Sequence, residues 1–235
     1  MSDKLEPVVV ARNIGNTSSW VKVKLPYTDA NGNVQSINVP QRLVLAGKTA
    51  SIDLRLYLLL ANLPSSIRFT GIEIEYTTAP GTVLLGAMSA SQSGKHTYPV
   101  PLMDPQRMPS SAGGFPWKVD GGYNTIVYIK NETDVARKYT ASLLFDGGGG
   151  YSHGIRELRP KETVAIDFKK LRDEQTEDVN GNVIPLNLES GQIAWSSKGP
   201  DNRTTSGRSE QVNETLGIAS TYACYNCCPN GFNDA

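Results

Sequence analysis

Apolar and polar residues alternate over short stretches, and this is the dominant pattern along the 235 residues of the chain. One such stretch places Val21, Val23, Leu25 and Tyr27 in alternation with Lys22, Lys24 and Pro26. The same pattern recurs at 50–54 and at 72–76. Turn-forming sequences at 29–33, 46–48 and 79–81 separate these stretches. Alternation with a period of two, bounded by turn residues, is typical of half-buried β-strands, so the sequence predicts an all-β protein.

The second half of the chain repeats the order of the first half. The matched features are Asn13 with Asn131, Val21, Val23, Leu25 and Tyr27 with Tyr139, Ala141, Leu143 and Phe145, the stretch 49–54 with 163–168, and Ile74 and Tyr76 with Ile193 and Trp195. The loops between these features differ in length, whereas the predicted inward faces are kept. We expect this result from the duplication of a β domain.

Each half contains several short strands, with a turn signal about every 8–12 residues, which is typical of a β-sandwich. We therefore predict an all-β fold of two tandem immunoglobulin/fibronectin type III-like β-sandwiches related by internal duplication. The first sandwich is predicted at 1–97 and the second at 123–222, with a Cys-rich tail at 223–235. The stretches 53–62 and 167–175 are rich in residues that favour helix, so each copy is expected to include a short helical turn.

The segment 98–122 is predicted to be a connector between the two sandwiches. It contains five prolines and four glycines, which disfavour a regular helix or a central strand. Phe115 and Trp117 would expose apolar surface in a loose linker. We therefore expect the connector to be docked.

The composition excludes several classes of protein. The chain has 23 basic and 23 acidic residues, so it lacks the charge imbalance of a nucleic-acid-binding or anionic-membrane-binding protein. Its longest apolar stretch, 56–61, is too short to span a membrane. The N-terminal residues lack the apolar core of a signal peptide. The motifs Gly-x-Ser-x-Gly and His-Glu-x-x-His are absent, so we predict neither an enzyme nor a cofactor.

The sharpest chemical feature is a cluster formed by Cys224, Cys227 and Cys228. Adjacent cysteines form a strained bond, so the pattern favours one disulfide from Cys224 to Cys227 or to Cys228. The remaining thiol would then be available for an intermolecular disulfide. A structural zinc site needs four ligands, and the two histidines are distant in the sequence. A tail with inert thiols is the third alternative. In every case the cysteines lie beyond the second sandwich and staple neither core.

Two short segments have oxygen-bearing side chains at alternate positions around a glycine, as in half of a calcium loop. They contain Asp29, Asn31 and Asn33, and Asp178, Asn180 and Asn182. Neither segment has the later bidentate Glu at the expected spacing. Asn-Gly between strand-like runs is a strong hairpin signal, so tight turns are the preferred interpretation.

An internal isopeptide bond and a sugar-binding face are two further alternatives. An internal isopeptide bond between Lys and Asn needs a buried acid, and no buried carboxylate stands out, because Asp53 and Asp167 alternate outward toward solvent. The three tryptophans and ten tyrosines are numerous enough for a sugar-stacking face. Trp195, however, occupies an inward position of its strand and is predicted to be part of the core.

Three sequence features together resemble a segment of large, uncharacterised bacterial surface or secreted proteins that contain immunoglobulin-like modules. These features are Gly-Gly-Phe-Pro-Trp at 113–117, Gly-Arg-Ser-Glu-Gln at 207–211 and Tyr-Ala-Cys-Tyr-Asn-Cys-Cys-Pro at 222–229. The resemblance implies a non-catalytic structural or adhesive module in an extracellular or cell-surface location. A protein or a surface glycan would be its partner. The alternative function is that of a carbohydrate-binding accessory module.

Overall fold

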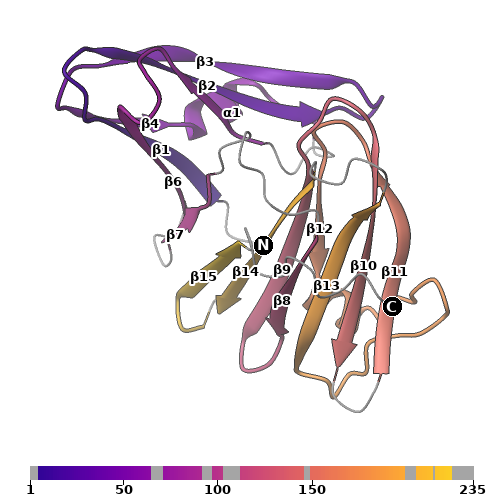
Figure 1. Ribbon diagram of the computed structural model, residues 1–235. Coiled ribbons are helices and arrows are strands. Elements are labelled where there is room, and N and C mark those ends of the chain that lie inside the picture. Colours follow the sequence, from indigo (N-terminus) through magenta and orange to yellow (C-terminus); the bar gives the residue numbers. More distant parts are fainter. Residues whose placement is uncertain are drawn as a thin grey trace. The chain divides into compact units, whose positions relative to one another are not determined.

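A computed structural model describes residues 5–64, 71–91, 97–102, 112–145, 149–198, 205–213 and 215–223 (Figure 1). The chain divides into two compact units, Met1–Leu102 and Met103–Ala235, which we call unit 1 and unit 2. Antiparallel strands make up most of the described residues of each unit. The predicted all-β class is therefore confirmed.

Unit 1 contains two sheets, with the strand orders β4–β1–β6–β7 and β3–β2–β5. The elements are β1 (Leu5–Asn13), β2 (Ser19–Thr28), β3 (Val34–Val44), β4 (Thr49–Asp53), α1 (Arg55–Leu60), β5 (Glu73–Tyr76), β6 (Val83–Ser91) and β7 (Thr97–Val100). Val9 and Ala11 of one sheet and Val21 and Val23 of the other are fully buried in a single core. Unit 1 is therefore a two-layered sandwich.

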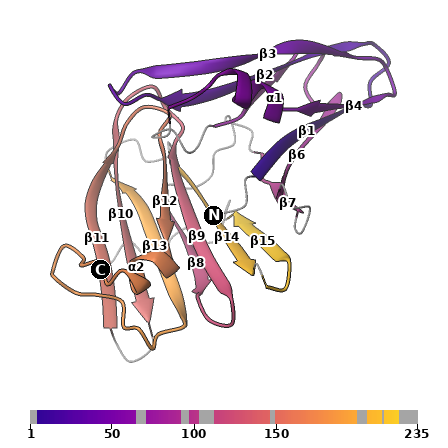
Figure 2. The ribbon, with the colours of Figure 1, turned by 180° about the vertical axis from the view of Figure 1, so that it is seen from behind.

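Unit 2 is also two-layered, with the strand orders β12–β9–β14–β15 and β11–β10–β13–β8 (Figure 2). The elements are β8 (Ala112–Lys118), β9 (Tyr123–Asn131), β10 (Arg137–Phe145), β11 (Gly149–Leu158), β12 (Thr163–Asp167), α2 (Phe168–Asp173), β13 (Ser190–Lys198), β14 (Thr205–Asn213) and β15 (Ile218–Ala223). Val127 and Ile129 of one sheet share a core with Ala141 and Trp195 of the other. Trp195 is only 3% exposed, as its inward position predicts.

The strands β1 to β7 have the same order in their sheets as β9 to β15 have in theirs. The register agrees as well, because Val9 pairs with Ile52 as Val127 pairs with Ile166. The predicted helical turns are α1 and α2, and each follows the strand that contains one of these isoleucines. Among the residues that the structure describes, unit 2 has one strand more, β8, which pairs with β13.

A buried asparagine occupies the same position in both units. The Asn13 amide donates to Thr17 O and Val44 O, and its Oδ1 accepts from Gly15 N. The Asn131 amide donates to Val135 O, Leu158 O and Arg159 O, and its Oδ1 accepts from Thr133 N. Both side chains are 0% exposed. Each asparagine therefore joins the turn after its own strand to the end of a strand in the other sheet.

One predicted match between the halves is shifted by two positions in the structure. Val23 pairs with Ile74, whereas its equivalent Ala141 pairs with Trp195. Ile74 is therefore equivalent to Trp195, and Ile72 is equivalent to Ile193. A two-residue shift leaves every side chain on the same face of the strand, so alternation alone could not reveal it.

Strands occupy part of the segment that was expected to be a connector at 98–122. Residues 97–100 belong to β7 of unit 1, and residues 112–118 form β8 of unit 2. Phe115 and Trp117 are 3% and 1% exposed and belong to the core of unit 2. The prolines disfavour a helix or a central strand, and β8 is neither, because it lies at the edge of its sheet among the described residues, where proline is tolerated.

Of the two aspartates that were expected to be solvated, Asp53 is exposed and Asp167 is half-buried. Asp167 is the N-cap residue of α2, and its Oδ1 accepts from Lys170 N and from the Asn124 amide. Its side chain therefore has a structural role at the start of this helix.

Candidate functional site

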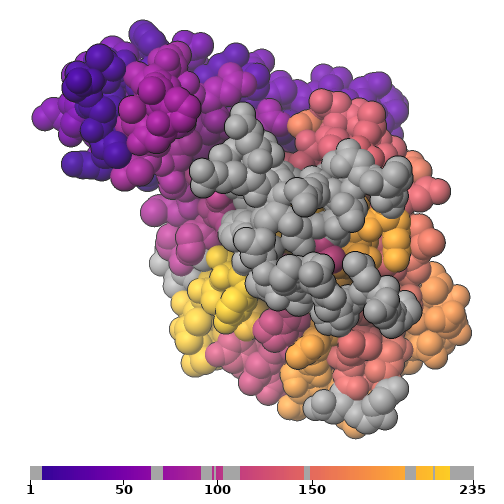
Figure 3. Space-filling view, viewed as in Figure 1, coloured from indigo at the N-terminus to yellow at the C-terminus, as the bar shows by residue number. Residues whose placement is uncertain are grey.

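The predicted thiol cluster, Cys224, Cys227 and Cys228, lies outside the described residues, which end at 223. The last described element before it is β15, an edge strand of the sheet β12–β9–β14–β15. In the space-filling view the β14–β15 hairpin is yellow and adjoins the pink turn between β8 and β9 (Figure 3). The state of the thiols stays a prediction.

The first calcium candidate forms the turn of the hairpin between β2 and β3. Asp29 Oδ1 accepts hydrogen bonds from Asn31 N and Asn33 N, each at 2.9 Å. Asp29 N donates to Asn33 O, and Gly32 adopts a φ of 86°. The hydrogen bond from Asn33 N lowers the pKa of Asp29. The carboxylate thus has main-chain partners that fix the turn.

The second calcium candidate has the same local hydrogen bonds but a different place in its unit, between α2 and β13. Asp178 Oδ1 accepts from Asn180 N at 2.7 Å and from Asn182 N at 2.8 Å. Its Oδ2 accepts from Ser152 N of β11 at 2.8 Å. Desolvation by itself would raise the pKa of Asp178, but these hydrogen bonds outweigh it and lower the pKa to about 2. This loop therefore covers the edge of β11 beside an irregularity in its pairing with β10.

A shallow hollow of about 360 Å³ lies beside this loop. Its lining includes Ser142 and Leu144 of β10, Tyr151 of β11, and Asp178 and Asn180 of the loop. Burial raises the pKa of the Tyr151 hydroxyl. Next to this tyrosine on β11, burial lowers the pKa of His153. These groups can donate and accept hydrogen bonds, but they form no nucleophile–base–orienter set.

A group of polar side chains covers the outer face of β9 and β14 in unit 2. We call it the polar cluster; it consists of Tyr128, Lys130, Glu132, Ser206, Arg208 and Glu210. The Glu210 carboxylate accepts from the Tyr128 hydroxyl at 3.0 Å and forms an ion pair with Arg208. The Arg208 guanidinium also lies 4.3 Å from the centre of the Tyr128 ring. Only 2% of Glu210 is exposed, although the residue points away from the core of the sandwich.

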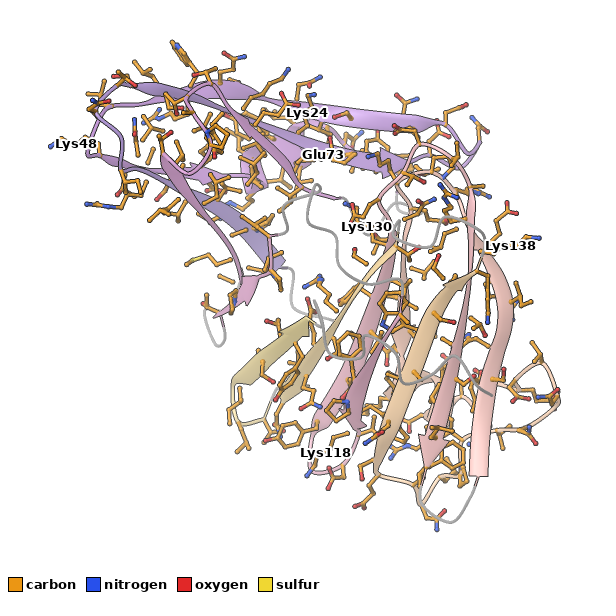
Figure 4. All side chains as sticks on the ribbon, viewed as in Figure 1. Lys24, Lys48, Glu73, Lys118, Lys130 and Lys138 are labelled. Atoms are coloured by element: carbon orange, nitrogen blue, oxygen red, sulfur yellow. The ribbon has the colours of Figure 1, made fainter. Side chains whose placement is uncertain are left out.

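The Glu210 carboxylate corrects the sequence interpretation, in which no buried carboxylate stood out. The remaining charges of the cluster are paired as well, because Lys130 forms an ion pair with Glu132 and the Ser206 hydroxyl donates to the same carboxylate (Figure 4 labels Lys130). An isopeptide bond needs an amine beside the buried acid. In this cluster the Lys130 amine binds Glu132, whereas the Glu210 carboxylate binds Arg208 and Tyr128. The cluster is thus a neutralised network that fixes this face.

The same face of unit 1 has the opposite character. In the register of β1 with β6, Val10 lies opposite Gly86, as Tyr128 lies opposite Arg208 in unit 2. Met88, the equivalent of Glu210, is 42% exposed. The alternation of Arg208 and Glu210 with small residues in the sequence can suggest that 206–210 is a strand with a charged face. It could not show that one of these charges becomes buried.

The tryptophans do not form an exposed aromatic row in the described part of the chain. Trp117 stacks on Phe168 with ring centres 5.2 Å apart, and Trp195 lies against Gly113 and Gly207. Trp20, in contrast, is 46% exposed on the outer face of β2, beside Leu43 of β3.

No helix in the described residues is long and apolar enough to cross a membrane. Within the same residues, no group of three or more His, Cys, Asp or Glu side chains is placed to hold a metal ion. Comparisons with protein-family models, curated proteins and solved structures found no match to this chain.

Proposed function

We propose that the chain is a non-catalytic structural or adhesive module of a bacterial extracellular or cell-surface protein, built from two immunoglobulin-like sandwiches that arose by duplication. The observation that carries the proposal is the matched pair of buried asparagines, Asn13 and Asn131, in two units with the same strand order. Repetition of one scaffold along a chain extends the molecule and multiplies its surface without adding a reaction centre.

The polar groups of unit 2 agree with this proposal. The polar cluster satisfies its own charges, and the Asp178 carboxylate is bound by main-chain amides. Catalytic groups are usually left with unmet bonding capacity directed at a substrate. The carboxylates of Glu210 and Asp178, in contrast, are bound by groups of unit 2 itself.

The location and the adhesive role can be tested on cells of the source organism. An antibody against this chain should label intact cells, and mild protease treatment of those cells should remove the label. The purified chain should inhibit attachment of the cells to the surface that they normally bind. The heat-unfolded chain should not inhibit it. Labelling only after permeabilisation would contradict the extracellular location. If the cells are labelled but the purified chain does not affect their attachment, the adhesive role is excluded and a structural role remains.

A carbohydrate-binding accessory module is the second candidate, and the exposed ring of Trp20 favours it. Apolar ring faces of sugars stack on exposed aromatic side chains, as bases do. The equivalent position in unit 2 carries Lys138 (Figure 4), so the exposed ring is specific to unit 1. In a glycan-array experiment, Trp20→Ala should abolish binding and Trp20→Phe should retain most of it. Equal binding by the parent chain and Trp20→Ala would exclude this ring as the sugar platform.

A further inference from the structure

The two units differ at one edge of a sheet. In unit 2, β8 pairs with β13 in an antiparallel register that runs from Ala112 to Lys118. The equivalent sheet of unit 1 has the order β3–β2–β5, and within the described residues no strand pairs with the outer side of β5. Unit 1 therefore has an acceptor position where unit 2 has its own strand.

The main chain of β5 points its hydrogen-bonding groups toward this position at alternate residues. Thr77 N donates to Trp20 O at 3.2 Å, and Gly71 N donates to Pro26 O at 2.7 Å. In an antiparallel ladder the residues in between turn their N–H and C=O groups to the other side. The N–H and C=O groups of Ile72 and Ile74 therefore point away from β2. Among the described residues, these main-chain groups have no partner on that side.

The side chains of these residues also differ from their equivalents in unit 2. Ile193 and Trp195 lie opposite Phe115 and Gly113 of β8 and are 1% and 3% exposed. Ile72 and Ile74 pack against the core of unit 1 but are only half-buried. A strand in the position of β8 would complete their burial.

The outer edge of β8 shows how such an edge is closed when no further strand is to be added. Pro116 has no N–H group, and its carbonyl accepts from the Gln211 side chain. The Thr125 hydroxyl accepts from Lys118 N and donates to Lys118 O. Within the described residues, the corresponding main-chain groups of Ile74 on β5 and of Ile72, which directly precedes β5, have no such side-chain partner.

We propose that the outer edge of β5 accepts an extended segment of another polypeptide, antiparallel to β5, as β8 lies along β13 in unit 2. Main-chain hydrogen bonds would supply the affinity, and alternate side chains would supply the specificity. This interaction goes beyond the proposed function and does not depend on it, because any role of the sandwich is compatible with an added strand.

The structure also specifies the pattern of the partner segment. A large apolar side chain is required opposite Ile72, as Phe115 lies opposite Ile193. Opposite Trp195 only glycine fits, since a Cβ on Gly113 would lie 2.8 Å from Trp195 Nε1. Ile74 is smaller than tryptophan, so a branched aliphatic residue fits opposite it. The preferred segment thus reads aliphatic, any residue, large apolar.

The probe is a synthetic peptide with the sequence of residues 112–119 that carries Gly113→Val. Amide hydrogen exchange of the full chain is followed by NMR with and without the peptide. In the free chain, the amides of Ile72 and Ile74 should exchange at least about tenfold faster than those of Ile193 and Trp195. Saturating peptide should slow exchange at Ile72 and Ile74 by about tenfold. The unsubstituted peptide should slow it less, and a control peptide with Phe115→Asp should have no effect.

Three results would overturn the proposal. Slow exchange at Ile72 and Ile74 in the free chain, independent of concentration, would show that the chain already covers this edge itself. Slow exchange that appears only at high protein concentration would assign the edge to a second copy of the chain. Unchanged exchange with the Gly113→Val peptide, or an equal effect of the Phe115→Asp peptide, would show that β5 does not accept a strand of this pattern.

Discussion

Replacement of Asn131 by alanine should remove a large fraction of the stability of unit 2. The change leaves three carbonyls, those of Val135, Leu158 and Arg159, without their amide donor, and Thr133 N without its acceptor. Each buried polar group that loses its partner costs about 1–3 kcal/mol. Some of these groups are only partly buried and can bind water instead, so we expect a total loss of about 3–5 kcal/mol.

Tryptophan fluorescence during urea unfolding can measure this loss in unit 2. Trp117 and Trp195 are buried in unit 2, whereas the tryptophan of unit 1, Trp20, is 46% exposed. With a urea dependence of about 2 kcal/mol per M, the midpoint should fall by about 1.5–2.5 M. The matched control is Asn13→Ala, which changes unit 1 and should leave this fluorescence transition in place. A shift below about 0.5 M for Asn131→Ala would refute the structural role of the asparagine.

A second variant separates hydrogen bonding from packing. Asn131→Asp keeps the shape of the side chain but turns an oxygen toward the three carbonyls. At neutral pH it should lose at least as much stability as the alanine variant, because a buried charge then faces only acceptors. Part of the loss should be recovered below about pH 4, where a protonated carboxyl can donate again. Equal stability of Asn131→Asp and the parent chain at pH 7 would contradict the assignment of the amide as the donor.

Four further predictions concern other sites. Gly207→Ala should destabilise unit 2 by about 1–3 kcal/mol in urea unfolding, because the added Cβ would lie 2.4 Å from Trp195 Cε2. The control is Gly86→Ala, whose added Cβ has nothing within 4 Å and should change the urea midpoint little. Equal effects of the two variants would refute the close packing of Gly207 on Trp195. Burial lowers the pKa of His153 from 6.5, so the stability that its neutral form contributes is complete above about pH 6.5 and is lost as the pH falls through the folded-state pKa. His153→Gln should reduce the loss of stability that urea unfolding measures between pH 7 and pH 5. An unchanged loss would show that the protonation of His153 does not cause it. The Asp178 contribution is complete above its ordinary pKa of 3.8 and is lost as the pH falls toward about 2, so Asp178→Asn should flatten the acid limb of the stability curve. Replacement of the three C-terminal cysteines by serine should leave the melting temperature unchanged and abolish any reductant-sensitive dimer; a stoichiometric metal lost in this variant would instead make the cluster a metal site.

Period-two alternation was sufficient to predict the strand-rich class and the inward faces, because burial of one sheet face imposes this pattern. The match of Asn13 with Asn131 corresponds to equivalent buried side chains in the structure. The match of Ile74 with Ile193 was wrong by two positions, because alternation fixes the face of a strand and leaves its register along the neighbour undetermined. The prolines of 98–122 disfavour a helix or a central strand, but they could not show that an edge strand would accommodate Pro116.

The site was less predictable than the fold. Main-chain hydrogen bonds form a turn at both Asp–Asn segments, but the sequence could not place Asp178 against Ser152 of a distant strand. The burial of Glu210 depends on partners that are far apart in sequence, such as Tyr128. Such contacts depend on the register between strands, and composition and local spacing do not determine it.

Two similar sandwiches in one chain can misassemble during folding, since a strand of one unit can insert into the other. Gly207 leaves room for the indole of Trp195, and the equivalent position in β6 of unit 1 carries Leu85. If β6 took the place of β14, Leu85 would collide with that indole. If β14 took the place of β6, the side chain of Leu85 would be missing from the core of unit 1, where it packs. Misassembly is therefore disfavoured in both directions, which favours the pairing of each unit with its own strand during folding.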